Sequence, residues 1–324
     1  MDNPKKHAYL ILAHNEFSLL KLLIKSLDDA RNDIYVHMDA KTKTFNPNDF
    51  DNITCFSELK FIPKIKVYWG GFSYTQAILS LMKEACSQQQ YDYYHFISGL
   101  DIPLQSQDAI HSFCNSTGVG SEFINMSDIS MQELNKFNLK KNKGIMQKIL
   151  YLFSRDQSKY GSRYFFFQKY FAYKRTHLIG KFICRFGQII MAFQQIAGIE
   201  KNKNLAIYKG TGWYSITHPV MSCILREERW IEKHFKYCLC SDEIYLQTLI
   251  KHFNLSERLS IHGSMRYIDW KRGSPYVFRE DDYSELINSG CFFARKFSTL
   301  ADREIIKKLY YRLLPAEAVD GILH

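Results

Sequence analysis

Several charged side chains stand where their types and spacing could do chemistry, and the clearest case is the run at 240–245. This run predicts the start of a helix over about 241–252, capped by Ser241 or Asp242, with Glu243 in the first turn. A helix N-terminus favours negative charge, so Glu243 would be ionised at neutral pH and able to take a proton from an attacking hydroxyl. Acids are common in first turns for this electrostatic reason alone, so a structural role is the alternative.

A phosphate-bearing substrate would have to be held without the common nucleotide loops, because neither Gly-x-x-x-x-Gly-Lys-Ser/Thr nor Gly-x-Gly-x-x-Gly occurs. A diphosphate still needs positive charge, from a divalent ion or from fixed cations. The expected strand end at 98–101 offers one carboxylate, Asp101, and the Asp-x-Asp at 49–51 lies in a polar loop. We therefore expect no metal ion and no other cofactor.

Two basic pairs are the candidate fixed cations, Lys271-Arg272 and Arg295-Lys296. Exposure to solvent is the alternative for both, as for most basic residues. Arg295-Lys296 lies inside the apolar run 291–297, where a charge pair needs a partner.

Other polar or aromatic residues stand at expected strand ends. His14 and His37 could be ligands or bases, although a hydrogen-bonded structural histidine is the alternative for each. Trp69, before Gly70-Gly71, could stack on a base or sugar, or fill the core before a tight turn.

The elements that must position these residues alternate strand and helix. Strands are expected at 7–13, 33–38, 64–69 and 93–97, with helices at 16–28 and from 73, which predicts an α/β fold with a mostly parallel, Rossmann-like sheet. A further strand is expected at 206–217. Ligands of such sheets bind at the carboxyl ends of the strands. His14, Asp39, Trp69 and Asp101 stand at those ends.

The chain reads as one domain, 1–324, with a nucleotide-binding half at 1–128, a helical insertion at 130–204 and a catalytic half at 205–324. The net charge of +10 is concentrated between 134 and 198, where 13 Lys and Arg face a single acid, Asp156. Aromatic residues interleave with these cations. The segment could bind an anionic membrane surface, line a groove for an acidic acceptor, or pack on the core with its cations in water.

The bulk composition also bears on location. No stretch of about 18 apolar residues occurs, and the apolar run at 8–13 is too short for a signal peptide. The eight cysteines mostly sit in apolar patterns, as reduced thiols do. We expect a cytoplasmic protein, peripheral at the inner face of the membrane if the basic segment binds there.

The motifs taken together resemble the core-2/I-branching N-acetylglucosaminyltransferase and peptide xylosyltransferase family (glycosyltransferase family 14). They occur in family order as AYLILAHN at 8–15, YVHMD at 35–39, WGGFS at 69–73, YHFISGLDIPL at 94–104, KGTGW at 209–213, SDE at 241–243, IDW at 268–270, GSP at 273–275 and FARKF at 293–297. Each motif is weak alone, whereas the ordered set covers nearly the whole chain.

The resemblance implies a GT-A type fold and an inverting, metal-independent transfer of a sugar from a UDP-sugar to a glycan hydroxyl. It implies that Glu243 is the base and that Lys296 contacts the diphosphate, with Lys271 or Arg272 as a further cation. The other donor-site residues it implies are His14, Asp39, Trp69, Gly70, Asp101, Trp213 and Arg295. UDP-GlcNAc is the first expected donor, with UDP-xylose and UDP-galactose as alternatives.

Two departures from the family pattern matter. The xylosyltransferase branch has an aspartate before the tryptophan, where this chain has Gly212, so that branch's base is absent. We also expect this protein to lack the membrane anchor and paired cysteines of the family's animal members. This suggests a bacterial enzyme of surface-polysaccharide synthesis, acting on a glycan or lipid-linked glycan. The non-enzymatic alternative is a basic-aromatic module that binds a polyanion; no nucleic-acid motif is present, and we expect no nucleic-acid partner.

Overall fold

The structure, a computed structural model, describes residues 6–116, 120–128, 130, 193–194, 197, 201–202, 204–238, 240–273 and 275–323. Nearly all of the predicted insertion at 130–204 lies outside the described residues, and with it the basic segment between 134 and 198.

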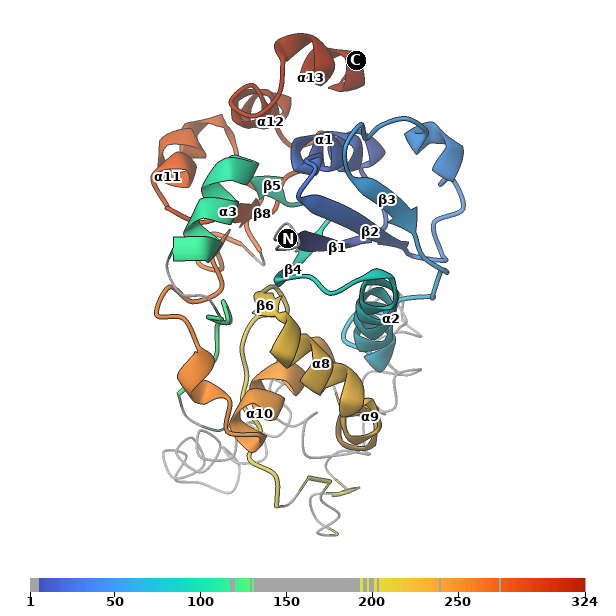
Figure 1. Cartoon of the computed structure of the whole chain (residues 1–324), viewed down its shortest axis with the longest axis vertical. Helices are drawn as coiled ribbons and strands as arrows, with labels where there is room; N and C mark the ends of the chain where they lie inside the picture. Colours follow the sequence, from blue (N-terminus) through green and yellow to red (C-terminus); the bar gives the residue numbers. More distant parts are fainter. Residues whose placement is uncertain are drawn as a thin grey trace, which may run out of the picture.

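A five-stranded sheet forms the centre of the molecule (Figure 1). Its strands are β1 (His7–Ala13), β2 (Asn32–Met38), β3 (Glu58–Phe61), β4 (Tyr93–Ser98) and β6 (Ser215–Thr217), in the order β3-β2-β1-β4-β6. The first four are parallel, and β6 runs antiparallel to β4. The predicted α/β class with a mostly parallel sheet is confirmed.

Helices cover both faces of this sheet, which explains why every residue of β1 and β2 is buried. Successive side chains of β1 alternate between the faces. Leu10 and Leu12 pack into the cluster that includes α2 (Phe72–Gln88), whereas Tyr9 and Ile11 pack into the one that includes α1 (Phe17–Leu27). Figure 1 shows these two helices on opposite sides of the strands.

A second, three-stranded sheet has the order β5-β8-β7, from β5 (Ile102–Pro103), β8 (Phe293–Arg295) and β7 (Arg266–Ile268). The last helices, α11 (Tyr283–Ile287), α12 (Arg303–Tyr310) and α13 (Ala316–Leu323), pack around it with α1 (Figure 1). The C-terminal segment thereby covers the first helix of the chain.

The other helices of the described residues lie on the α2 side or flank the sheet. They are α3 (Gln107–Ser116), α8 (His218–Arg226), α9 (Glu228–Phe235) and α10 (Tyr245–His252), with the short 3-10 turns η1 (Pro47–Phe50), η3 (Ser241–Glu243), η4 (Ser256–Arg258) and η5 (Glu280–Asp282). Among the described residues, no helix combines the length and apolarity needed to cross a membrane.

Two strand predictions were wrong, one in position and one in extent. The third strand is Glu58–Phe61 rather than 64–69, because the amides beyond it are used by side chains: Ile65 N donates to His37 Nε2 (2.9 Å) and Val67 N to Asp39 Oδ1 (3.3 Å). The strand expected over 206–217 is ordered as β6 only at 215–217.

The buried guanidinium of Arg266 joins the two sheets. Its Nη2 donates to the carbonyl oxygens of Phe96 (3.2 Å) and Tyr214 (3.0 Å) and to Ser215 Oγ (3.0 Å), and its Nη1 donates to the carbonyl of Ser264 (2.9 Å). One side chain from β7 therefore ties β4 to β6.

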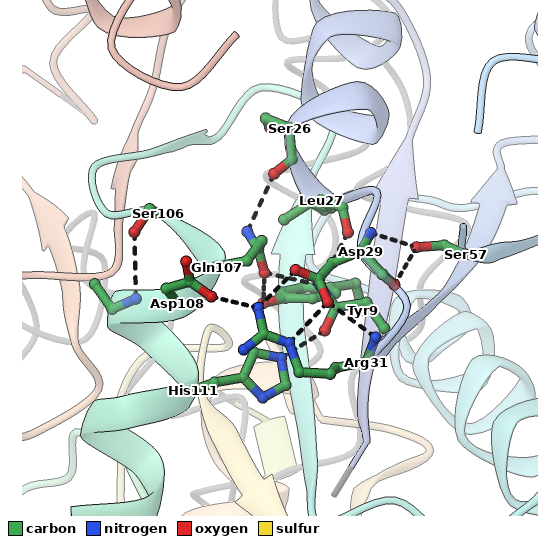
Figure 2. Close-up of polar contacts among 12 residues, drawn as sticks. Tyr9, Ser26, Leu27, Asp29, Arg31, Ser57, Ser106, Gln107, Asp108 and His111 are labelled. Carbon is green, nitrogen blue, oxygen red and sulfur yellow. Dashed lines mark hydrogen bonds and ion pairs between the residues drawn. The ribbon is translucent and has the colours of Figure 1, made fainter. Parts of the chain in front are cut away.

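A polar network holds the amino ends of β1 and β2 to α1 and α3 (Figure 2). Tyr9 Oη donates to Gln107 Oε1 (2.7 Å), whose amide nitrogen donates to the carbonyl of Ser26 (3.2 Å). Arg31 pairs with Asp29 (2.6 Å) and with Asp108 (2.7 Å). These hydrogen bonds and ion pairs stabilise the end of the sheet that lies opposite the carboxyl ends of the strands.

Candidate active site

The carboxyl ends of β1, β2, β4 and β8 bring together residues that the sequence placed at strand ends. Burial lowers the pKa of His14; the charge of Asp39 opposes this, and the cations Lys41, Lys296 and Arg295 add to it. These charges act on His14 because β1, β2 and β8 end close to one another. At neutral pH the His14 imidazole is therefore uncharged.

Asp39 and His37 are held by backbone groups. Asp39 Oδ1 accepts from Lys41 N (2.9 Å), and its Oδ2 lies 3.4 Å from Lys41 Nζ. His37 Nε2 accepts a backbone hydrogen bond, and burial lowers its pKa, which fits the structural alternative for this histidine.

Asp101 organises the turn after β4. Ser98 donates to its two carboxylate oxygens, from N to Oδ2 (3.0 Å) and from Oγ to Oδ1 (2.6 Å), and the Asp101 side chain is only 1% exposed. Its Oδ1 also lies 3.8 Å from Arg295 Nε. The Asp101 carboxylate is thus hydrogen-bonded within the turn and paired with Arg295.

Arg295 lies over the ring of Trp213, which Tyr74 contacts in turn. Its guanidinium carbon is 4.0 Å from the centre of the Trp213 ring, and Tyr74 meets Trp213 edge-on at 6.3 Å. Arg295 Nη1 is buried without a hydrogen-bond partner. An unpaired buried donor is costly, so this nitrogen is suited to a ligand that supplies an acceptor.

Lys296, next along the chain, is partly buried and has no ion-pair partner within the described part of the chain. Its backbone is fixed on both sides, since Lys296 N donates to the carbonyl of Tyr276 (3.3 Å) and Phe278 N donates to the carbonyl of Lys296 (3.1 Å). Arg295 and Lys296 therefore put two cations on a fixed backbone.

The other predicted basic pair is placed differently. Arg272 is exposed and forms ion pairs with Asp269, Asp282 and Glu285, and these carboxylates raise the pKa of Arg272. Lys271 is exposed beside it. The charge of Arg272 is thus already balanced by three acids, whereas Lys296 has no ion-pair partner within the described residues.

The acidic run at 241–243 forms the separate turn η3, not the start of a long helix. The predicted cap was wrong: Ser241 Oγ is hydrogen-bonded to Thr75 Oγ1 of α2 (2.7 Å), and α10 begins only at Tyr245. Glu243 Oε2 lies 3.1 Å from Lys209 Nζ. The carboxylate of Glu243 is therefore paired with Lys209, instead of lying in the first turn of a long helix as predicted.

Trp69 is exposed, with 73% of its surface accessible, so the core alternative for this residue was wrong. Gly70 has a φ of 69°, a conformation that glycine adopts without strain. The Gly70 carbonyl accepts from Cys240 N (2.8 Å), which ties this loop to the turn that carries Glu243.

Sequence reasoning did not single out Lys209, Tyr74 or Lys41 as site residues. Lys209 and Tyr74 stand within or beside recognised motifs, at 209–213 and 69–73, which was the available signal. Within the described residues, no group of three His, Cys, Asp or Glu side chains is arranged to hold a metal ion.

These motifs and their geometry agree with a comparison of the whole sequence. The sequence profile described as Core-2/I-Branching enzyme matches residues 7–286. The chain belongs to this glycosyltransferase family. Its relatives include xylosyltransferase 2 of Bos taurus, which is 21% identical over 96% of the chain, and that of Homo sapiens, which is 20% identical over 97% of the chain.

The chain spans about a third of the length of these curated relatives (34% of each). Among solved structures, mouse xyloside xylosyltransferase 1 in its apo form aligns with 90% of this chain and 97% of its own, at 7% identity and a TM-score of 0.37. That likeness is too distant to inform the site.

Proposed function

We propose that this family member transfers a sugar from a UDP-sugar to a glycan hydroxyl with inversion at the anomeric carbon, without a metal ion. The observation that carries the proposal is the Arg295 guanidinium, stacked on Trp213 and fixed by Asp101, with one buried nitrogen that lacks an acceptor. A guanidinium presents paired donors in the geometry that phosphate oxygens accept.

The leaving group would lie at the strand ends. Arg295 and Lys296 offset the charge that develops on the diphosphate as its bond to the sugar breaks, which is the role a divalent ion would otherwise have. His14, uncharged at neutral pH, can hydrogen-bond the donor without adding to that charge. The exposed Trp69 ring offers a face for the base or the sugar.

The base would come from η3. Glu243 takes the proton of the acceptor hydroxyl while the hydroxyl oxygen attacks the anomeric carbon and UDP departs with the electrons of the broken bond. Gly70 and Thr75 bond η3 to the Trp69 loop and to α2, so the base lies on a supported turn.

The donor sugar is a finer proposal. We put UDP-GlcNAc first because the aspartate of the xylosyltransferase branch is replaced by Gly212. UDP-xylose is the second candidate, favoured by relatives that are named xylosyltransferases, and UDP-galactose is the third. The acceptor we propose is a surface-polysaccharide or lipid-linked glycan, extended in the cytoplasm of a bacterium.

The test is turnover of the three UDP-sugars by the purified protein, with and without EDTA. We expect UDP release from at least one donor at a rate that EDTA leaves unchanged, because Arg295 and Lys296 supply the charge. If no nucleotide sugar is bound or turned over, the transferase proposal fails. An absolute need for manganese or magnesium would reject only the metal-independent part.

A further inference from the structure

Lys209 pairs with the proposed base but takes no part in the steps of the proposed reaction. Its Nζ lies 3.1 Å from Glu243 Oε2, and the two side chains are 42% and 30% exposed. Ion pairs as exposed as this one add little to the stability of a fold. The pair is therefore open to a role in the reaction, and a substitution of Lys209 should leave the fold intact.

The backbone that carries Lys209 is held by its neighbours on both sides. Ser127 N donates to the carbonyl of Lys209 (2.7 Å), and Gly210 N donates to the carbonyl of Glu243 (2.8 Å). A Cβ added to Gly210 would lie 1.8 Å from the carbonyl oxygen of Asn125, so a residue with a side chain would force these segments apart. The close approach fixes the point from which the Lys209 side chain extends.

The same loop is bonded to the helix that follows the base and leads to the proposed phosphate site. Gln247 of α10, which is fully buried, donates through Nε2 to the carbonyl of Thr211 (3.0 Å). Thr211 Oγ1 donates to the carbonyl of Trp213 (3.1 Å), and Arg295 lies over the Trp213 ring. The loop 209–213 thus connects the proposed base to the cation that would bind the leaving diphosphate.

We propose that Lys209 is a positioning residue, which holds the Glu243 carboxylate by Oε2 and leaves Oε1 to take the proton of the acceptor hydroxyl. The inference rests on the proposed glycosyl transfer. One dipeptide holds Glu243 at two points, its main chain through Gly210 N and its side chain through Lys209 Nζ. Lys209 keeps its proton throughout, and the only proton that moves is that of the attacking hydroxyl. A base held in one orientation raises the rate without changing how the donor binds.

Three substitutions separate positioning from a structural role. Lys209→Met removes the charge and keeps an unbranched side chain, Lys209→Arg restores a cation, and Lys236→Met is the matched control. Lys236 forms a similarly exposed ion pair with Glu232 (2.7 Å). The reaction is UDP release from UDP-GlcNAc, UDP-xylose or UDP-galactose, with water in place of the glycan hydroxyl. Thermal melting reports whether each variant folds, and we expect all to melt as the wild type does.

Lys209→Met should lower kcat about tenfold and leave KM for the donor unchanged, a smaller loss than removal of the base itself would cause. Lys209→Arg should recover most of the lost rate, and Lys236→Met should match the wild type. An ammonium beside a carboxylate opposes protonation of that carboxylate, so loss of the charge alone would raise the rate. A kcat that rises or stays unchanged in Lys209→Met therefore overturns the inference.

A double-mutant cycle shows whether Lys209 acts through Glu243. Glu243→Gln removes the carboxylate that Lys209 holds, so adding Lys209→Met to that variant should lower kcat no further. An equal loss in both backgrounds would mean that Lys209 acts elsewhere, and this inference would be wrong while the transferase proposal stands. If the wild type releases UDP from none of the three donors, the proposed function fails and this inference fails with it.

Discussion

Arg295 combines several requirements of the proposed phosphate site in one side chain. Its guanidinium lies over the Trp213 ring, its Nε is 3.8 Å from Asp101, and its buried Nη1 has no hydrogen-bond partner. A lysine at this position would be a point charge with neither the stacking face nor the paired donors. Arginine is therefore the residue type that this geometry calls for.

Lys296 should matter for donor binding more than for folding. Lys296→Ala should weaken UDP binding about 10-fold or more, because a hydrogen bond to a charged group contributes about 1.5–3 kcal/mol. Calorimetric titration with UDP measures this directly. Lys307→Ala on α12, which removes an ion pair with Asp320 on α13, is the matched control and should bind UDP as the wild type does. Equal affinities in all three proteins would contradict the assignment.

Glu243 should affect the rate and leave donor affinity alone. Glu243→Gln keeps the shape and removes the basicity, and we expect kcat/KM for transfer to fall about 10²-fold, the size typical of losing a general base. The control is Glu228→Gln on α9, whose partner is Lys83. Activity of Glu243→Gln within a few-fold of wild type would assign the base to another carboxylate.

At the residue scale, the sequence correctly placed His14, Asp39 and Asp101 at strand ends and missed how the site residues pair. The placement of Trp69 at a strand end was wrong, because β3 ends at Phe61. His14, Asp39 and Asp101 follow buried apolar runs, and a local pattern is enough to find them. The pairing of Lys209 with Glu243, and the place of Asp242 against Gly212, bring together segments some 30 residues apart. Such contacts depend on how η3 packs on α2, which local spacing does not encode.

At the scale of elements, buried histidines near the amino ends of β1 and β4 predict that the fold loses stability in acid. His111 of α3 is hydrogen-bonded through Nε2 to Asn32 Oδ1 (2.9 Å) and stacks on His7 at 3.8 Å. Burial, with the charge of Arg31, lowers the pKa of His111 to about 4. His7 and His95 are also shifted downward by burial.

The sign of the resulting pH dependence follows from these shifts. Between pH 6.5, the usual pKa of histidine, and about pH 4, His111 binds a proton in the unfolded chain but not in the folded protein. Stability is therefore full above pH 6.5 and falls as the pH drops, by at most about 1.4 kcal/mol per pH unit for each such histidine.

Urea unfolding at pH 7 and pH 5 tests this expectation. His111→Gln, which keeps a donor for Asn32, should lose less stability between the two pH values than the wild type loses. His262→Gln, at an exposed position, is the control and should behave as the wild type. An unchanged loss in His111→Gln would show that His111 does not carry the effect.

Element type was more predictable than element extent. The continuous apolar runs of β1, β2 and β4 and the amphipathic face of α1 were recognisable because burial on both sheet faces leaves a clear pattern. The third strand was misplaced because residues 65–67 have a strand-like sequence, while their amides bond to His37 and Asp39 instead of a neighbouring strand. The periodicity of apolar residues does not predict hydrogen bonds from backbone amides to side-chain acceptors of this kind.

At the scale of the whole molecule, the basic segment between 134 and 198 invites a membrane test, although it lies outside the described residues. Membrane association predicts co-sedimentation with anionic liposomes that weakens as salt is added. Charge reversal at Lys140, Lys141 and Lys143 should abolish co-sedimentation and leave turnover of a soluble acceptor intact. Lost acceptor affinity without liposome binding would favour an acceptor groove, and no change in either would favour a structural role.

The tie that Arg266 makes across the two sheets also has a consequence for how the protein is made on the ribosome. Arg266 bonds to a carbonyl 170 residues earlier in β4, and the β4–β6 contact between His95 and Ser215 spans 120 residues. While the intervening chain is being synthesised, β4 has no neighbour on that side, and an open strand edge invites pairing with other chains. We therefore expect the edge of β4 to stay open on the nascent chain until β6 has left the exit tunnel.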